Sequence, residues 1–179
     1  MELKNLTEKT LKIFGAESTD ELASSIMKTV ETNDFNVYKK FEEMVKDLST
    51  DWLQKIYQYY LADRKEKKQD YTPKSLAKLM AKLALQKNDG LIVDMCAGSG
   101  ALIIQAWNLD NDLEFECLEY DEKVLPMLIF NMAIRNIRST VKHMDVLQDE
   151  ILNIYTIEPT EKYGKVVKQH GNNNQQSAV

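Results

Sequence analysis

The chain has 179 residues, of which 44% are hydrophobic and 28% are charged, and its net charge is −5. A globular chain of this size can bury one good core or two small ones, and the negative charge argues against tight, independent binding to DNA. There is no apolar stretch long enough to span a membrane, and residues 1–5 lack the pattern of a signal peptide, so we expect a cytoplasmic protein without membrane contact.

Residues 1–70 are predicted to be helical throughout, because apolar side chains recur every three or four residues. Serine, threonine and aspartate at 18–20 and at 49–51 supply capping residues for two of these helices. We expect the aromatic residues Trp52, Tyr59 and Tyr60 to lie in the core, although an aromatic helix face could instead pack against a partner.

A helix start is predicted after the densest basic run of the chain, 64–68. We interpret this run as a solvated helix end or linker, although its position leaves contact with DNA phosphates open. Thr72 can cap the helix that follows, and Pro73 suits its first turn. The apolar positions of this helix are Leu76, Leu79, Met80, Leu83 and Ala84.

A strand at about 91–94 ends in Asp94 and runs into a glycine turn, which opens a helix over about 101–109. Gly98 and Gly100 have no side chain to hold a ligand away, and they can adopt the positive φ that a tight turn requires. Asp94 lies at the carboxyl end of a buried strand, where doubly wound sheets bind their ligands. The pattern therefore predicts a nucleotide-cofactor site.

The spacing of this loop is D-x-x-x-G-x-G, whereas a dinucleotide fingerprint reads G-x-G-x-x-G and would need a third glycine where Ile103 stands. The leading acid favours S-adenosylmethionine over NAD, because the methionine half of S-adenosylmethionine carries an ammonium and a sulfonium rather than a pyrophosphate. An NAD-linked oxidoreductase is disfavoured for the same reason. Cys96 and Cys117 form no CxxC motif or Cys/His cluster, so no metal site is expected.

Two further strands end in acids. The strand at 113–118 leads into Glu119, at the distance from the glycine loop where an acid binds ribose hydroxyls, although Glu119 could instead cap the helix starting near residue 122. A third strand ends in Asp145, which could hold an adenine amino group or could equally be an ordinary loop or N-cap aspartate.

The order of elements after residue 91 predicts strands alternating with helices, which gives a parallel sheet covered on both faces. Its fourth strand is expected at 163–167. The edge of so small a sheet would carry unpaired backbone groups and an apolar flank, so we expect a partner or a second copy to associate there.

Taken in chain order, these segments resemble the DNA N6-adenine methyltransferases, most closely the methylation subunit of type I restriction-modification systems. That family has a helical N-terminal region, an F/Y-T-P segment and a D-P-A-C-G-S-G loop. Here the segment is 71–73 and the loop reads D-M-C-A-G-S-G, with Met95 in place of proline and Cys96 one place early. Residues 130–137 and 145–147 resemble later parts of the family, and the resemblance spans roughly residues 1–168.

The resemblance implies an α/β fold, in which an N-terminal helical region precedes a partial Rossmann-like, S-adenosylmethionine-dependent methyltransferase sheet. The F/Y-T-P segment would touch the methionine end of the cofactor, the glycine loop would surround it, and the later acids would hold ribose and adenine. The resemblance implies Tyr71, Thr72 and Pro73 for the F/Y-T-P segment, and Asp94, Cys96, Gly98 and Gly100 for the glycine loop. It implies Glu119 as the acid that holds ribose and Asp145 as the acid that approaches adenine.

The catalytic segment of the family, N-P-P-F/Y, is absent, because no proline follows Pro159. In the family its asparagine and a backbone carbonyl accept hydrogen bonds from the target amino group, and its aromatic residue stacks on the flipped adenine. We therefore expect no catalytic residue in this chain, and only about four of the roughly seven strands of a complete family sheet.

Two hypotheses follow. The first is a DNA adenine-N6 methyltransferase-family protein, truncated or split, which binds S-adenosylmethionine and needs a partner subunit for DNA binding and catalysis. The second is a non-catalytic protein that keeps the cofactor fold and engages methylase or DNA-processing partners, or acts as a decoy for them. The expected divisions are a helical region at 1–70, a partial methyltransferase domain at 71–168 and a flexible tail at 169–179.

Overall fold

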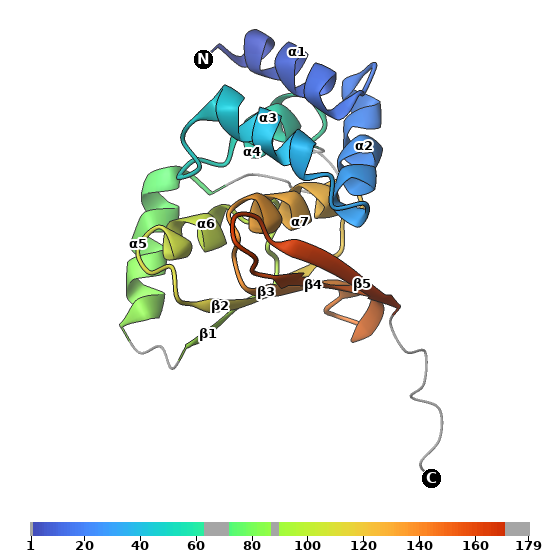
Figure 1. Ribbon diagram of the computed structural model, residues 1–179. Helices are drawn as coiled ribbons and strands as arrows, with labels where there is room; N and C mark the ends of the chain where they lie inside the picture. Colours follow the sequence, from blue (N-terminus) through green and yellow to red (C-terminus); the bar gives the residue numbers. More distant parts are fainter. Residues whose placement is uncertain (1, 63–71, 87–89, 171–179) are drawn as a thin grey trace.

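The computed structural model describes residues 2–62, 72–86 and 90–170, which form seven helices and five strands (Figure 1). Four helices come first: α1 (Leu3–Phe14), α2 (Thr19–Glu31), α3 (Phe35–Val45) and α4 (Trp52–Tyr60). They are followed by α5 (Lys74–Leu85), β1 (Leu91–Asp94), α6 (Ala101–Trp107), β2 (Glu114–Glu119), α7 (Leu125–Ile134), β3 (Ser139–Asp145), β4 (Glu150–Glu158) and β5 (Lys165–His170). None of the described helices is long and apolar enough to cross a membrane.

These elements confirm the α/β class and the helical N-terminal region. β5 reaches His170, inside the segment predicted as a flexible tail, while residues 171–179 lie outside the described part of the chain. The basic run at 64–68 also lies outside it.

Aspartate side chains begin two of the N-terminal helices. Asp34 accepts a hydrogen bond from the N–H of Asn36 at 3.1 Å at the start of α3, and Asp51 accepts one from the N–H of Gln54 at 2.9 Å at the start of α4. Such caps satisfy N–H groups that have no partner within the helix. Ser18 occupies the N-cap position of α2 without a side-chain hydrogen bond.

Phe130 on α7 connects the helical region to the sheet. Its ring centroid lies 5.0 Å from that of Phe14, 4.9 Å from Tyr38 and 5.2 Å from Phe41, and each pair meets edge to face. Tyr38 also lies 5.5 Å from Tyr163, just before β5. Residues of the helical region and of the sheet therefore belong to one hydrophobic core.

The strands lie in the order β1-β2-β3-β4-β5; β1 to β3 are parallel, and β4 and β5 are antiparallel to their neighbours. The prediction of an all-parallel sheet with a helix after the third strand is therefore wrong. The Asp145 carboxylate accepts hydrogen bonds from the N–H groups of Leu147 and Gln148, at 2.9 and 3.2 Å, and this closes a short turn into β4. So short a connection requires an antiparallel return, because parallel strands need a crossover of about a dozen residues or more.

All the described helices lie on one side of the sheet, so the prediction that helices cover both faces is also wrong for this part of the chain (Figure 1). The side chains of Phe115, Val141 and Tyr155 are buried beneath the helices. The opposite face carries an ion pair in which Lys142 Nζ lies 2.8 Å from Glu116 Oε1. This face has the polar character of a sheet surface that meets water.

Two of the aromatic residues predicted in the core are instead at the surface. Tyr59 is 70% exposed and Tyr60 is 43% exposed, while Ile56 and Tyr57 are the buried residues of this part of α4. Trp52 is partly buried, and its indole N–H donates to the carbonyl of Asp47 at 2.6 Å. The error arose because several neighbouring residues near the end of α4 are apolar or aromatic, so helical periodicity fits more than one face of this helix equally well.

We expect Phe130→Ala to lower the free energy of unfolding by about 3–5 kcal/mol, because it empties the centre of the aromatic cluster. Urea denaturation followed by circular dichroism would measure this. Tyr59→Ala is the matched control, since it removes an exposed aromatic ring and should change stability by no more than about 0.5 kcal/mol. Equal losses in the two variants would contradict the assignment of the core.

Candidate cofactor-binding site

The glycine loop folds between the ends of β1 and β2. The N–H of Ala97 donates to the carbonyl of Leu118 at the end of β2 at 3.0 Å, and the N–H of Gly100 donates back to the carbonyl of Ala97 at 2.8 Å. Gly98 and Gly100 have positive φ angles of 56° and 90°. The turn therefore requires the conformation that glycine adopts most readily, as the sequence predicts.

Glu119 lies against this loop. One carboxylate oxygen, Oε2, accepts a hydrogen bond from the N–H of Gly98 at 2.7 Å, and Oε1 accepts from the N–H groups of Tyr120 at 2.9 Å and Asp121 at 2.7 Å. Burial raises the pKa of Glu119, although these N–H donors act in the opposite direction. The structure thus brings Gly98 and Glu119 together. Glu119 does not cap the next helix, whose N-cap residue is Val124.

Asp94 offers a different kind of carboxylate. Its Oδ1 accepts a hydrogen bond from the N–H of Cys96 at 3.3 Å, while its Oδ2 is buried without a hydrogen-bond partner among the described residues. Burial raises the pKa of Asp94. A buried acceptor without a donor is unfavourable, so this oxygen is suited to a ligand that brings a donor or a positive charge. The Cys96 side chain is exposed.

Asp145 is at the end of β3, and its carboxylate closes the turn into β4. Besides the two N–H groups already described, the side-chain amide of Gln148 donates to Asp145 Oδ2 at 2.9 Å. The ordinary loop role that the sequence left open is therefore present. His143 connects the neighbouring strand ends, since its Nε2 lies 3.0 Å from the carbonyl oxygen of Tyr120.

The segment before α5 lies beside a hollow between the start of α4 and α6. Thr72 and Pro73 line a hollow of about 510 Å³ together with Asp51, Ala101 and Gln105. Pro73 is the N-cap residue and α5 begins at Lys74, so the predicted capping by the Thr72 side chain is wrong. Tyr71 lies outside the described residues.

A buried network that the sequence did not predict holds the glycine loop against α7 and the start of α4. The side-chain amide of Asn131 on α7 donates to Asp51 Oδ1 at 3.0 Å and to the carbonyl of Ser99 at 2.9 Å. Arg135 in turn donates to the side-chain oxygen of Asn131 at 2.8 Å. Asn131 and Arg135 stand four residues apart at the end of an otherwise apolar helix, and that spacing was the only signal in the sequence.

Arg135 also ties down the loop that leads into α4. It donates to the carbonyls of Leu48 at 2.8 Å and Thr50 at 3.0 Å. Burial lowers the pKa of Arg135 to about 10, so it remains charged at neutral pH, and burial raises the pKa of Asp51. The network therefore joins α4, the glycine loop and α7.

These features define a class of protein: an α/β protein with a glycine turn at the carboxyl end of its parallel strands, where one acid ends β1 and a second ends β2. The sequence profile of the N-6 DNA methylase family matches residues 48–170, and the chain belongs to that family. No curated protein and no solved structure gives a significant match. Among the described residues there is no group of His, Cys, Asp and Glu that could hold a metal ion.

We expect Asn131→Ala to lower the free energy of unfolding by about 2–3 kcal/mol, because Asp51 and the Ser99 carbonyl would lose a buried donor. Urea denaturation would measure the loss. Asn108→Ala is the matched control: Asn108 donates to the carbonyl of Ser49 at an exposed position, so its removal should matter by only about 0.5 kcal/mol. A loss for Asn131→Ala no larger than that of the control would contradict the importance of the network.

Proposed function

We propose that this chain is a cytoplasmic S-adenosylmethionine-binding subunit for the methylation of adenine N6 in DNA, similar to the methylation subunit of type I restriction-modification systems. The observation that carries the proposal is the pairing of two unlike carboxylates at one loop. Glu119 holds the backbone of Gly98, while Asp94 keeps a buried oxygen without a donor. This arrangement stands in a chain of the N-6 DNA methylase family.

Each predicted residue has a role in the proposal. Asp94 Oδ2 would accept from the ammonium end of the cofactor, and Glu119 Oε2, which accepts one N–H, would accept a ribose hydroxyl through its remaining lone pair. Asp145 would accept from the adenine amino group through Oδ2, beside Gln148. The remaining residues would enclose the cofactor. Tyr71, Thr72 and Pro73 would touch its methionine end, and the backbone of the glycine loop at Cys96, Gly98 and Gly100 would surround it.

When bound, S-adenosylmethionine supplies an electrophilic methyl group. This chain would hold and orient the cofactor, and positioning is itself a large part of such catalysis. The acceptors for the target amino group and the aromatic residue that stacks on the flipped base belong to the N-P-P-F/Y segment. We propose that a partner polypeptide supplies that segment and most of the DNA contacts, in keeping with the net charge of −5 on this chain.

The second candidate is a non-catalytic protein that engages methylase partners or acts as a decoy for them. It is favoured by the hydrogen bonds of Glu119, whose carboxylate already accepts three backbone N–H groups of this chain without a ligand. A methyl-transfer assay on unmethylated DNA, with and without candidate partner subunits, separates the two. Incorporation with a partner rejects the decoy, and inactivity with every partner rejects the enzyme subunit.

We expect Asp94→Ala and Glu119→Ala each to weaken the binding of S-adenosylmethionine by about 1–3 kcal/mol, the range for losing a hydrogen bond to a charged group. Calorimetric titration would measure it. Glu116→Gln is the matched control, because its carboxylate pairs with Lys142 on the opposite face of the sheet and should leave affinity unchanged. Binding of NADH without binding of S-adenosylmethionine would overturn the assignment.

The affinity should also depend on pH. Burial raises the pKa of Glu119 above its ordinary value of 4.5, and the ionised carboxylate is the form that accepts ribose hydroxyls without competing as a donor. Affinity should therefore fall as the pH falls through this raised pKa, starting at a higher pH than for an exposed glutamate. Glu119→Gln cannot titrate, so it should bind more weakly at neutral pH and lose less affinity on acidification. An equal pH dependence in both proteins would contradict the role of Glu119.

A further inference from the structure

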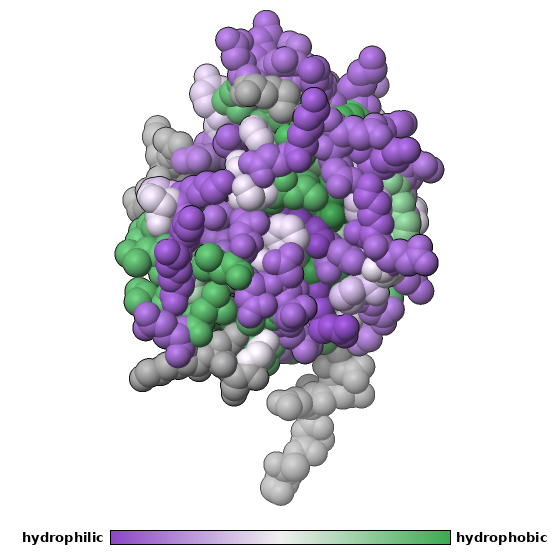
Figure 2. Space-filling model, turned by 60° about the vertical axis from the view of Figure 1, so that its left-hand side comes forward, coloured by the Kyte–Doolittle hydropathy of each residue, from purple (hydrophilic) through white to green (hydrophobic). Residues whose placement is uncertain are grey.

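The hollow of about 510 Å³ lies between the start of α4, the start of α5 and α6. Thr72 and Pro73 line it, and the proposed function assigns both residues to the methionine end of the cofactor. Figure 2 brings this side of the molecule forward and shows apolar side chains gathered on part of it, in keeping with the exposed Leu79 and Leu83 of α5. The hollow is instead lined mainly by residues with polar side chains, and charged groups of both signs are among them.

Asp51 is the acidic side chain of this hollow. It is 6% exposed, and its Oδ1 accepts hydrogen bonds from the N–H of Gln54 at 2.9 Å and from the amide of Asn131 at 3.0 Å. Asn131 also donates to the carbonyl of Ser99, so Asp51 is held in a fixed position relative to the glycine loop.

The second oxygen of this carboxylate is unsatisfied. Asp51 Oδ2 is buried and has no hydrogen-bond partner among the described residues, although the Ser99 hydroxyl lies beside the carboxylate. A buried acceptor without a donor is unfavourable, so Oδ2 is suited to a ligand that donates a hydrogen bond.

Lys74, the first residue of α5, supplies positive charge to the same hollow. Its Nζ donates to Thr50 Oγ1 at 3.0 Å and to Ser49 Oγ at 3.3 Å, and both acceptors are neutral. Because an ammonium has three N–H donors, one donor remains. The first turn of α5 adds to this charge, since it contains no acidic residue and its N-cap residue, Pro73, makes no side-chain cap.

The two groups define the chemistry of a complementary ligand, which must carry a donor and an anion close together. An α-amino acid group has both, because its ammonium and its carboxylate are joined to the same carbon atom. A phosphate would suit Lys74 but would be repelled by Asp51. The other basic side chain of the hollow, Lys55, is engaged elsewhere, with its Nζ 4.1 Å from the centroid of the Trp52 ring.

We propose that Asp51 and Lys74 recognise the amino-acid end of S-adenosylmethionine: Asp51 Oδ2 accepts from the ammonium, and Lys74 with the first turn of α5 holds the carboxylate. This inference rests on the proposed function, and it adds residues of the helical region and of α5 to those of the glycine loop. The ammonium carries three donors, so it can serve Asp51 as well as Asp94. Its charge also favours the ionised form of a buried carboxylate.

The test compares adenosyl ligands that differ at this end, by calorimetric titration of the full chain. S-adenosylhomocysteine keeps the amino-acid group, whereas 5′-methylthioadenosine ends in a methyl group. We expect Asp51→Asn to weaken the binding of S-adenosylhomocysteine about tenfold and to leave that of 5′-methylthioadenosine unchanged. Asparagine keeps the Oδ1 acceptor for Gln54 and Asn131, and unchanged binding of 5′-methylthioadenosine would show that the variant is folded.

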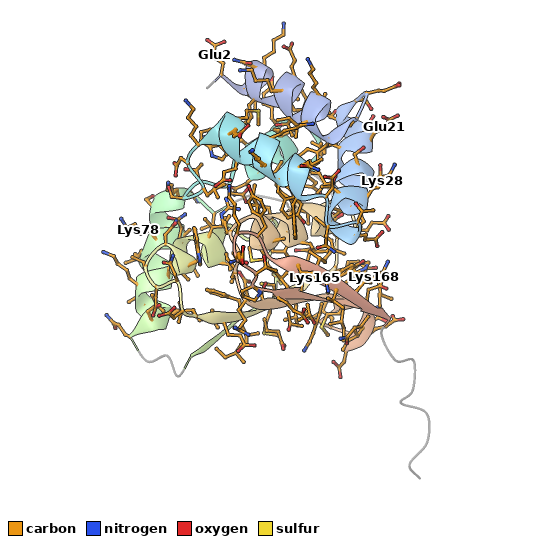
Figure 3. The ribbon with its side chains drawn as sticks, viewed as in Figure 1. Glu2, Glu21, Lys28, Lys78, Lys165 and Lys168 are labelled. Carbon is orange, nitrogen blue, oxygen red and sulfur yellow. The ribbon has the colours of Figure 1, made fainter. Side chains whose placement is uncertain are left out.

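Two further ligands separate the roles of the two residues: S-adenosylhomocysteine without its amino group, and S-adenosylhomocysteine without its carboxylate. Asp51→Asn should not weaken the deaminated ligand. Lys74→Gln should weaken the ligands that keep the carboxylate about threefold, and should not weaken the decarboxylated one. Lys78→Gln is the matched control and should change no affinity, because Lys78 lies one turn further along α5 and points away from the body of the protein in Figure 3.

The possible results distinguish failure of this inference from failure of the proposed function. If no adenosyl ligand binds the unmodified protein, both are rejected. If Asp51→Asn weakens S-adenosylhomocysteine and 5′-methylthioadenosine equally, or weakens neither, this inference is rejected and cofactor binding stands. Binding of free methionine as tight as that of S-adenosylhomocysteine would assign the hollow to a free amino acid, and would also reject the inference.

Discussion

The amide of Asn131 joins the parts of this molecule at one buried point. It donates to a carboxylate from the helical region and to a carbonyl of the glycine loop, and Arg135 holds it in place. A buried acceptor that loses its donor retains the whole desolvation penalty, so the loop and the helical region are held in their positions together. The shape of the glycine loop therefore depends on Asp51, which lies at the start of α4 and far earlier in the chain.

The two acids at the strand ends, Glu119 and Asp94, differ in how their carboxylates are hydrogen-bonded. Glu119 fixes the loop by accepting backbone N–H groups, including that of Gly98. Asp94 contributes little to the loop and leaves one oxygen unsatisfied. Glu119 thus fixes the backbone of the loop, whereas Asp94 leaves a buried acceptor without a donor. The family match begins at residue 48, so it includes Asp51 and the whole buried network.

Local signals allowed much of this to be predicted. The glycine turn, the acid after β1 and the acid after β2 follow from residue type and spacing, because each depends on neighbours within one strand–turn–helix unit. The antiparallel return into β4 was missed because the Asp145 turn resembles a helix N-cap in sequence. Asn131 was missed because its partner Asp51 lies 80 residues away, and Tyr59 was misplaced because periodicity does not say where a core ends.

The position of Phe130 has a consequence for synthesis. Its partners Phe14, Tyr38 and Phe41 leave the ribosome first, and the ring that completes their packing arrives only with α7. In that interval the aromatic side chains of the nascent helices are exposed to water, and exposed apolar surface of this kind promotes aggregation or chaperone binding. Slow translation between α4 and α7 would therefore lengthen the interval in which this aromatic surface is exposed.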